Sequence, residues 1–260
     1  MQDNNPLKIG KISSKKSKIK QRPLMEQGIL PKHSSVSIFC GSQGSGKTNL
    51  LVSLLSRKIF YGKKNSNSKK GYFDEIILFT NSDDDMYDDL IKKGIIKKHL
   101  IKFNPTPDDI QMIIDHQNSI IKKAKDISKT PKVLVIFEDI VSSRALMRSE
   151  AFLECFFRPR HLNFSVWLLT QYLKIVPKSL RMQANHVFAF RGNKLENSIL
   201  EEHYTPPECC SKCFNMLIKD ATTVEENDSH PFLHVAKNQP VEKRFRRNLL
   251  MYLEPQCTHL

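Results

Sequence analysis

The chain has 260 residues, of which 40% are hydrophobic and 26% are charged, and its formal net charge is +14. This length suits one large α/β domain with tails and argues against two full-sized domains. The longest apolar runs, such as 132–137 and 166–169, are far shorter than a membrane span, and no apolar signal sequence follows the N-terminus, so we expect a soluble protein of a cytosol-like compartment with no membrane span.

The positive charge is concentrated near the two ends of the chain. Residues 1–22 carry a net charge of +6 and residues 237–247 carry +4. Because 1–30 are polar and lack periodicity, we predict a basic flexible N-terminal arm there, an ordered domain over 31–237 and a basic C-terminal tail over 238–260. The two basic segments favour contact with nucleic acid or another polyanion, and simple solvation of a basic chain is the alternative.

The first ordered element is a predicted strand over 36–40 that leads into a glycine-rich loop and a helix. Residues 41–48 read GSQGSGKT, which fits the P-loop pattern G-x-x-x-x-G-K-[ST] at every fixed position. Leucines recur after it at helical spacing, and we expect this helix to end near Phe60. A P-loop requires this strand, loop and helix order, whereas a glycine-rich turn that merely caps a helix does not.

The residue types of this loop predict nucleotide binding with ATP and Mg²⁺. Glycines let successive backbone N–H groups turn inward around a phosphate at a helix N-terminus. Lys47 then reaches the β- and γ-phosphates, and the Thr48 hydroxyl binds Mg²⁺. The expected nucleotide-binding residues are Gly41, Ser42, Gln43, Gly44, Ser45, Gly46, Lys47, Thr48 and Asn49.

The next segments read as ordinary α/β structure. We predict a basic exposed loop over 61–71, a buried strand over 74–80 and a short strand over 99–103. The acidic run 82–85 is interpreted as a solvated loop and helix start rather than a metal site. A helix opens at Thr106 with a cap residue, Pro107 and acidic residues in its first turn.

The second candidate for chemistry is the apolar run 132–137, which ends in Glu138 and Asp139. A buried strand that delivers two acids beside bound phosphates is the Walker B arrangement of P-loop enzymes. We assign Glu138 to the magnesium side and Asp139 to the attacking water. Most such motifs read Asp-Asp or Asp-Glu, so the order found here leaves the division of roles open.

A helix over 143–157 and a strand over 164–171 follow. Gln171 closes this strand, at the end where open α/β sheets bind ligands, and either reaches the γ-phosphate or simply bonds a loop. We then predict a short helix within 175–185 that carries Arg181, a strand over 186–190, helices over 194–203 and 206–220, and an edge strand over 231–236.

Six cysteines in a chain without a secretory signal are expected to be reduced thiols. Cys209, Cys210 and Cys213 contain a C-x-x-C spacing that zinc sites use, with His203, His230 and His234 nearby in the sequence. We favour a capped helix start with a proline at its first position, because no second C-x-x-C is present.

The order of these motifs resembles the genome-packaging ATPases of poxviruses, giant viruses and virophages, in the FtsK/HerA superfamily. The resemblance covers roughly residues 32–237. The P-loop alone is shared by many families, and the Arg-His, Thr-Gln and Leu-Arg blocks in this order are more specific. The segments that carry it are 41–48, 135–140, 160–166, 169–172 and 177–181.

This resemblance implies a RecA-like, ASCE-type P-loop fold with a mostly parallel central sheet and an extra strand between the two Walker strands. It further implies a homo-oligomeric ring that moves double-stranded DNA, independent of its sequence, into a capsid, with capsid or portal-vertex proteins as partners, in the host cytoplasm or the virion. Gln171 is then the γ-phosphate sensor. An arginine supplied to the neighbouring subunit is expected, with Arg160 preferred over Arg158, Arg144, Arg148 and Arg181.

Two other functions stay open on the sequence. One is a P-loop NTPase of another kind, such as a nucleotide kinase or switch, whose basic ends bind acidic protein or RNA. The other is a virion component that holds nucleotide and DNA without hydrolysis. The intact set of Lys47, Thr48, Glu138 and Asp139 argues against the second.

Overall fold

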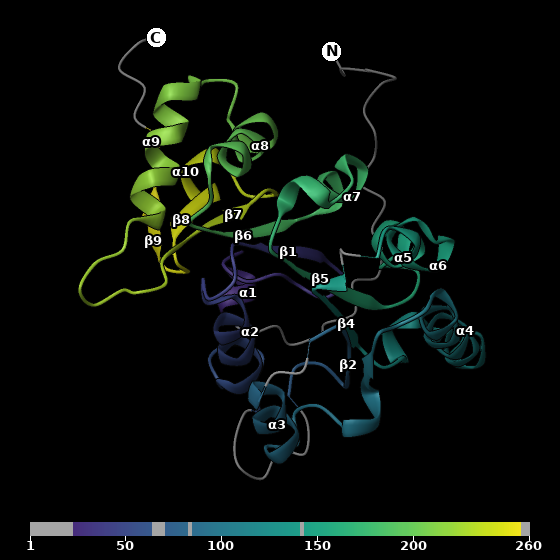
Figure 1. The fold of residues 1–260 in the computed structure, drawn as a ribbon. Helices are drawn as coiled ribbons and strands as arrows, with labels where there is room; N and C mark the ends of the chain where they lie inside the picture. The colour runs from purple at the N-terminus through teal and green to yellow at the C-terminus, as the bar shows by residue number, and fades with distance from the viewer. Residues whose placement is uncertain (1–22, 64–70, 83–84, 141–142, 256–260) are drawn as a thin grey trace, which may run out of the picture.

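The computed structural model describes residues 23–63, 71–82, 85–140 and 143–255 (Figure 1). Most of the predicted N-terminal arm, the centre of the lysine-rich loop and part of the acidic run 82–85 lie outside these residues. No helix among the described residues unites the length and the apolar character that a membrane crossing requires.

A nine-stranded sheet runs through the described part of the chain, in the order β3-β2-β4-β5-β1-β6-β7-β8-β9. The strands are β1 (Val36–Cys40), β2 (Glu75–Thr80), β3 (Ile101–Phe103), β4 (Val133–Glu138), β5 (Phe164–Thr170), β6 (His186–Phe190), β7 (Phe232–Ala236), β8 (Phe245–Arg247) and β9 (Met251–Leu253). Along this order, the strands β3, β2, β4, β5, β1 and β6 pair in parallel. β7 then pairs antiparallel with β6, β8 with β7, and β9 with β8. This confirms the predicted α/β class with a mostly parallel sheet, and β5 is the extra strand between β1 and β4.

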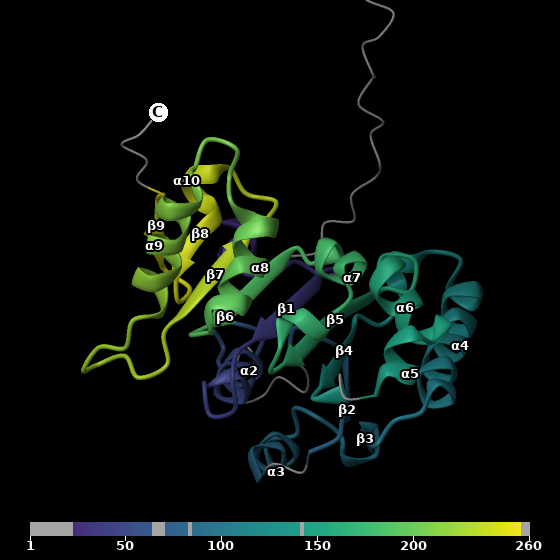
Figure 2. The same cartoon turned by 45° about the horizontal axis from the view of Figure 1, so that its top comes forward.

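Helices cover both faces of the sheet, as Figures 1 and 2 show from two sides. One face carries α1 (Pro23–Glu26), α2 (Lys47–Ser56) and α3 (Asp85–Lys92). The other carries α4 (Pro107–Ala124), α5 (Arg144–Arg148), α6 (Glu150–Phe157), α7 (Lys178–Gln183), α8 (Lys194–Tyr204) and α9 (Ser211–Thr222). The short α10 (Val241–Arg244) lies next to β9.

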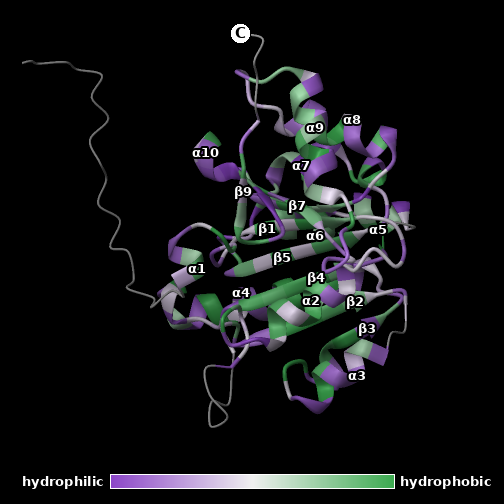
Figure 3. Cartoon of the chain, turned by 90° about the vertical axis from the view of Figure 1, so that its left-hand side faces the viewer, coloured by the Kyte–Doolittle hydropathy of each residue, from purple (hydrophilic) through white to green (hydrophobic). Residues whose placement is uncertain are grey.

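The central strands are apolar at nearly every position because both of their faces are covered. β1, β4 and β5 are buried along their whole length, and Figure 3 shows β2 and β4 as continuous hydrophobic strands while the helices mix apolar and polar residues. Phe137 packs on α6 on one face, and Phe39 and Trp167 pack together on the other. Such strands carry no alternating pattern, which is why continuous apolar runs predicted them.

Several helix boundaries differ from the sequence prediction, each for a local reason. The helix expected over 143–157 divides at Ser149, whose extended backbone breaks the helix and whose hydroxyl caps α6 by accepting from Phe152 N. The helix expected from 206 begins at Ser211, where Cys210 is the N-cap. α2 ends at Ser56 because the chain turns there and buries Tyr61 against Phe73 and Trp167.

Both predicted ends of the ordered domain need correction. At the N-terminus, α1 and the residues after it bury Met25, Ile29 and Leu30, so the described fold begins before residue 31. At the C-terminus, β7 is not an edge strand, because β8 and β9 extend the sheet beyond it. The segment predicted to be a basic tail therefore contributes two strands.

The basic cluster over 237–247 is partly structural for the same reason. Arg246 is fully buried, and its guanidinium lies 4.7 Å from the centre of the Tyr252 ring. Arg247 is also buried and donates to the carbonyl oxygens of Asp220 and Thr223. These two arginines are closed to a polyanion, so the C-terminal cluster offers fewer exposed charges than its sequence indicates.

Two buried histidines, His186 and His234, and the partly buried His33 predict a stability that depends on pH. Burial lowers the pKa of His33 to about 4 and that of His186 to about 3, and it lowers the pKa of His234 well below its usual value. His33 bonds Ser165 and Asn163, and His186 bonds His234. Below pH ~6.5 the unfolded chain binds protons at these sites and the folded chain does not, so acid favours unfolding.

The free energy of unfolding is therefore expected to fall as the pH drops from ~6.5 towards 4, by about 1.4 kcal/mol per pH unit for each such histidine. Urea unfolding at several pH values measures this slope. His33→Gln is expected to reduce the slope, and the same change at the exposed His116 serves as the control. Equal stability at pH 7 and pH 5 would contradict the prediction.

Candidate functional site

The loop over 41–48 joins β1 to α2, and space as well as backbone angle requires its glycines. Gly44 and Gly46 have φ values of 73° and 100°, which L side chains rarely adopt. A Cβ on Gly41 would lie 2.7 Å from Ser45 Oγ, and a Cβ on Gly46 would lie 2.9 Å from the Cβ of His230. α2 starts without a side-chain cap. Its first N–H groups are therefore the kind of donors that bind an anion.

Lys47 lies buried at the start of α2 and reaches back over the loop. Its Nζ donates to the carbonyl oxygens of Gly41 at 2.8 Å and Ser42 at 2.9 Å. Burial lowers the pKa of Lys47, and the nearby carboxylates of Asp139 and Glu138 act in the opposite direction. The ammonium group thus stands between the loop and the acids at the end of β4.

Glu138 is buried at the end of β4 and is bonded from two other elements. Thr48 Oγ1 donates to its Oε1 at 3.1 Å across 90 residues of sequence, and Thr80 Oγ1, at the end of β2, lies 3.5 Å from its Oε2. Two hydroxyl groups thus meet a carboxylate here, and their oxygens are of the ligand type that Mg²⁺ prefers. No larger group of metal-binding side chains occurs in the described ranges. This fits a Mg²⁺ ion that takes its remaining ligands from phosphate and water.

Asp139 directly follows β4 and has a left-handed backbone, with φ at 50°. Its N–H donates to the Leu169 carbonyl at 3.2 Å, which ties the end of β4 to β5. Gln171 Nε2 donates to Asp139 Oδ2 at 3.4 Å. A carboxylate and an amide from adjacent strands therefore stand together beside the glycine-rich loop.

Strand register explains why these groups meet. β5 lies between β1 and β4, with Cys40 level with Thr170 and Glu138 level with Leu169. The residues that follow each strand consequently emerge at one edge of the sheet, where parallel α/β sheets bind ligands. The structure thus brings Lys47, Thr48, Glu138, Asp139 and Gln171 together.

The structure does not bring Arg160 to this edge. Arg160 precedes β5 and lines a cavity of about 430 Å³ with Lys32, His33 and His186 at the opposite ends of the strands. A role in its own subunit's site is excluded by this position, and a role in a neighbouring subunit stays a prediction.

The other four arginines occupy different settings. Arg181 is buried and donates to the carbonyls of Leu173 and Val176 and to His203, so it holds its own loop together. Arg158 pairs with Glu154 at 2.8 Å. Arg144 and Arg148 are exposed on α5, which follows β4.

Two residues at the same edge escaped the sequence analysis. Thr80 ends β2 and contacts Glu138. Arg191 directly follows β6, is exposed, and lines a cavity of about 300 Å³ together with Gly41, Ser42 and Gln171. The signal was present for both, since each is a polar residue at the end of an apolar strand, the pattern that singled out Gln171.

The side chains near the cysteine cluster separate in the fold. Cys210 Sγ lies 3.2 Å from Cys213 Sγ at the start of α9. His203 bonds Arg181, His234 is buried beside His186, and His230 lies against Gly46. The three histidines therefore contact different residues in three separate parts of the fold and do not gather at the cysteines.

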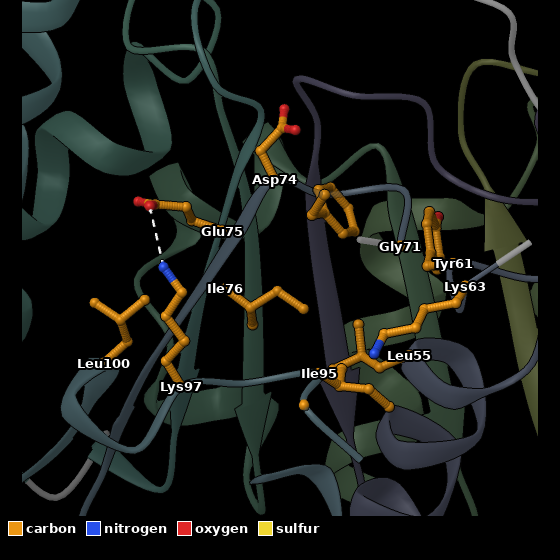
Figure 4. A pocket seen from close by; sticks show the side chains of 12 residues that line it. Leu55, Tyr61, Lys63, Gly71, Asp74, Glu75, Ile76, Ile95, Lys97 and Leu100 are labelled. Atoms are coloured by element: carbon orange, nitrogen blue, oxygen red, sulfur yellow. Dashed lines mark ion pairs between the residues drawn. The ribbon is translucent and has the colours of Figure 1, made fainter. Parts of the chain in front are cut away.

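A cavity of about 170 Å³ lies at the other end of β2 (Figure 4). Its walls include Leu55, Tyr61 and Ile76, and Lys97 lies 3.8 Å from Glu75 within its lining. Glu75 begins β2 whereas Thr80 ends it, so this cavity is remote from Glu138 and we assign it no part in the site.

Comparison with protein families shows the family to which the chain belongs. The family model described as "Poxvirus A32 protein" matches residues 26–203, more than half of the chain. The chain belongs to this family. The resemblance to viral genome-packaging ATPases is thereby confirmed, and the matched range begins within α1, where the described fold also begins.

The A32-family chain also resembles an uncharacterised protein, 015R of frog virus 3 (isolate Goorha). The two are 25% identical over 158 residues, which cover 61% of this chain and 44% of the relative. The match thus spans less than half of the relative's length.

Solved structures share the fold at low sequence identity. The genome packaging NTPase B204 of Sulfolobus turreted icosahedral virus 2, in complex with ATP-gammaS, is 14% identical with a TM-score of 0.53, over 84% of this chain and 98% of that one. The DNA-packaging ATPase B204 of Sulfolobus turreted icosahedral virus is 14% identical with a TM-score of 0.51, over 79% of this chain and 93% of that one. EssC (ATPases 2 and 3) of Geobacillus thermodenitrificans is 11% identical with a TM-score of 0.52, over 87% of this chain and 40% of that one. These neighbours confirm the RecA-like P-loop fold.

Proposed function

We propose that this protein is an ATPase motor that moves double-stranded DNA, independent of sequence, into a viral capsid. The observation that carries the proposal is the contact between Thr48 and Glu138, with Asp139 and Gln171 beside it, at the mouth of a glycine-rich loop. Membership of the A32 family and the likeness to B204, described as a DNA-packaging ATPase, support it.

Each residue then has a role in hydrolysis. The backbone N–H groups of 41–49 hold the phosphates, and Lys47 leaves its loop carbonyls to bind the β- and γ-phosphates. Thr48 and Glu138 hold Mg²⁺, which when bound neutralises charge on the phosphate oxygens. Asp139 accepts a proton from the attacking water, and Gln171 orients that water and contacts the γ-phosphate.

Movement of DNA requires neighbouring subunits and contacts between the protein and the DNA. We propose a homo-oligomeric ring in which Arg160 of one subunit serves the nucleotide of the next, where its charge stabilises the departing phosphoryl group. Basic segments, including residues 1–22 with their net charge of +6, contact DNA phosphates without reading bases. Capsid or portal-vertex proteins are the remaining partners, in the host cytoplasm or the virion.

Hydrolysis of ATP by the full chain, with and without long duplex DNA over a salt series, tests the proposal. We expect duplex DNA to stimulate phosphate release, and the stimulation to fade steeply as salt rises because phosphate contacts release counterions. Equal rates with and without DNA would instead favour a nucleotide kinase or switch. No hydrolysis under any condition would favour a virion component that binds without turnover.

A further inference from the structure

A wide groove of about 800 Å³ adjoins the glycine-rich loop on the side away from Glu138. Three segments form most of it: the exposed side of α2, the loop over 223–230 between α9 and β7, and the turn over 248–250 between β8 and β9. Gly46 of the glycine-rich loop lines the groove, as does Asn49 in the first turn of α2. A ligand bound at the loop can therefore extend into the groove without a break.

The position of Glu138 gives the direction in which a nucleotide would lie. Thr48 contacts Glu138, so the reactive end of a triphosphate belongs on the β4 side of the loop. The groove lies on the other side of β1, where Phe190 of β6 and Phe232 of β7 line it. With the terminal phosphate at Glu138, the nucleoside is directed towards Asn49 and the groove.

His230 stands where the groove meets the loop. A Cβ on Gly46 would lie 2.9 Å from the Cβ of His230 and 3.0 Å from its Cγ, so the two residues are in close contact. His230 is exposed, and Leu50 and Leu250 line the same groove. A flat ring with apolar neighbours suits the face of a nucleobase.

The loop that carries His230 is held in place by a buried arginine. Arg247 donates to the carbonyls of Asp220 and Thr223, at 2.6 and 2.8 Å, and to Asp228 Oδ2 at 3.0 Å. Asn248 Nδ2 donates to the same Asp228 oxygen at 2.9 Å. These bonds tie Thr223 and Asp228 of the loop to Arg247 of β8 and to Asn248 directly after it, which holds His230 beside Gly46.

We infer that this groove is the nucleoside subsite of the protein, in which His230 stacks on the base and Asp228 with Arg247 positions the loop that presents it. The inference rests on the proposed function, because it assumes that a nucleoside triphosphate binds at the glycine-rich loop. The loop over 223–230 and the strand β8 lie beyond residue 203, outside the range that the family model matches.

Calorimetric titration of the full chain with two ligands tests the inference: a non-hydrolysable ATP analogue and inorganic tripolyphosphate, both with Mg²⁺. Tripolyphosphate fills the phosphate loop but carries no nucleoside. We expect the unaltered chain to bind the ATP analogue more tightly. His230→Ala is expected to weaken that binding about tenfold, from the usual worth of one stacked base, and to leave tripolyphosphate binding unchanged. His230→Phe keeps a flat ring and is expected to restore the analogue's affinity.

Asp228→Ala is expected to act like His230→Ala, since it frees the loop, and a merely structural role would not separate the two ligands. His116→Ala, an exposed histidine on α4, is the matched control. Equal affinity of the two ligands for the unaltered chain, or unchanged analogue binding in His230→Ala, would overturn the subsite while phosphate binding persists. Binding of neither ligand would overturn the proposed function as well.

Discussion

Replacing Lys47 by alanine is expected to lower the rate of ATP hydrolysis about a hundredfold to a thousandfold, the usual effect of removing one group that stabilises charge in the transition state. The ammonium group is the cation that the structure presents between the glycine-rich loop and the acids of β4. Its loss leaves the charge that develops on the β- and γ-phosphates without a partner. Steady-state phosphate release at saturating ATP measures the effect.

The fold is expected to survive this change. Lys47 makes two hydrogen bonds to loop carbonyls, and α2 keeps its apolar face with Leu51, Leu54 and Leu55 buried. A thermal melt within a few degrees of the unaltered chain would show this. Lys122→Ala, at an exposed position on α4, is the control and should hydrolyse ATP normally. Normal turnover by Lys47→Ala would refute the assignment of the loop.

Replacing Glu138 by glutamine is expected to lower turnover to a similar degree and to raise the Mg²⁺ concentration needed for half-maximal rate. Glutamine keeps the shape and can still accept from Thr48, but it removes the charge that favours a divalent cation. Asp139→Asn is expected to lower turnover with an unchanged Mg²⁺ requirement, because Asp139 bonds Gln171 and not Thr48. Magnesium titrations of hydrolysis compare the two variants.

This pair of variants answers the question that the order of the two acids leaves open. Glu150→Gln, an exposed acid at the start of α6, is the control for loss of one negative charge. If Asp139→Asn shifts the Mg²⁺ requirement and Glu138→Gln does not, the roles are the reverse of those proposed. If neither variant slows turnover, the acids at the end of β4 are not part of the site.

Long-range placement explains the predictions that were wrong. The strand over 231–236 was expected at the edge of the sheet, but β8 pairs with it through residues that look like a basic tail. A short strand with two arginines has no apolar run, so periodicity could not reveal it. Arg246 of this strand is fully buried, and its guanidinium contacts the ring of Tyr252 on the neighbouring strand.

The same limit applies within the site. The end of a single strand left two roles open for Gln171, and the fold gives it a partner because β5 lies beside β4, which Asp139 follows. Arg160 is one of several basic residues in its part of the sequence. It precedes β5, and so it lies at the ends of the strands opposite to the glycine-rich loop. His230 was considered with the cysteines because it is near them in sequence, whereas the fold sets it against Gly46.

The sequence by itself determined what depends on near neighbours along the chain. The glycines of the loop, the apolar strands with acids or amides at their ends, and the caps of α4 are of this kind, because backbone angles and helix starts involve only a few adjacent residues. Only the tertiary structure decided the strand order, the meeting of Thr48 with Glu138, and the groove between α2 and the last strands. These join residues up to about two hundred positions apart, such as Gly46 and Leu250, and their packing depends on many side chains between the layers at once, which no local pattern records.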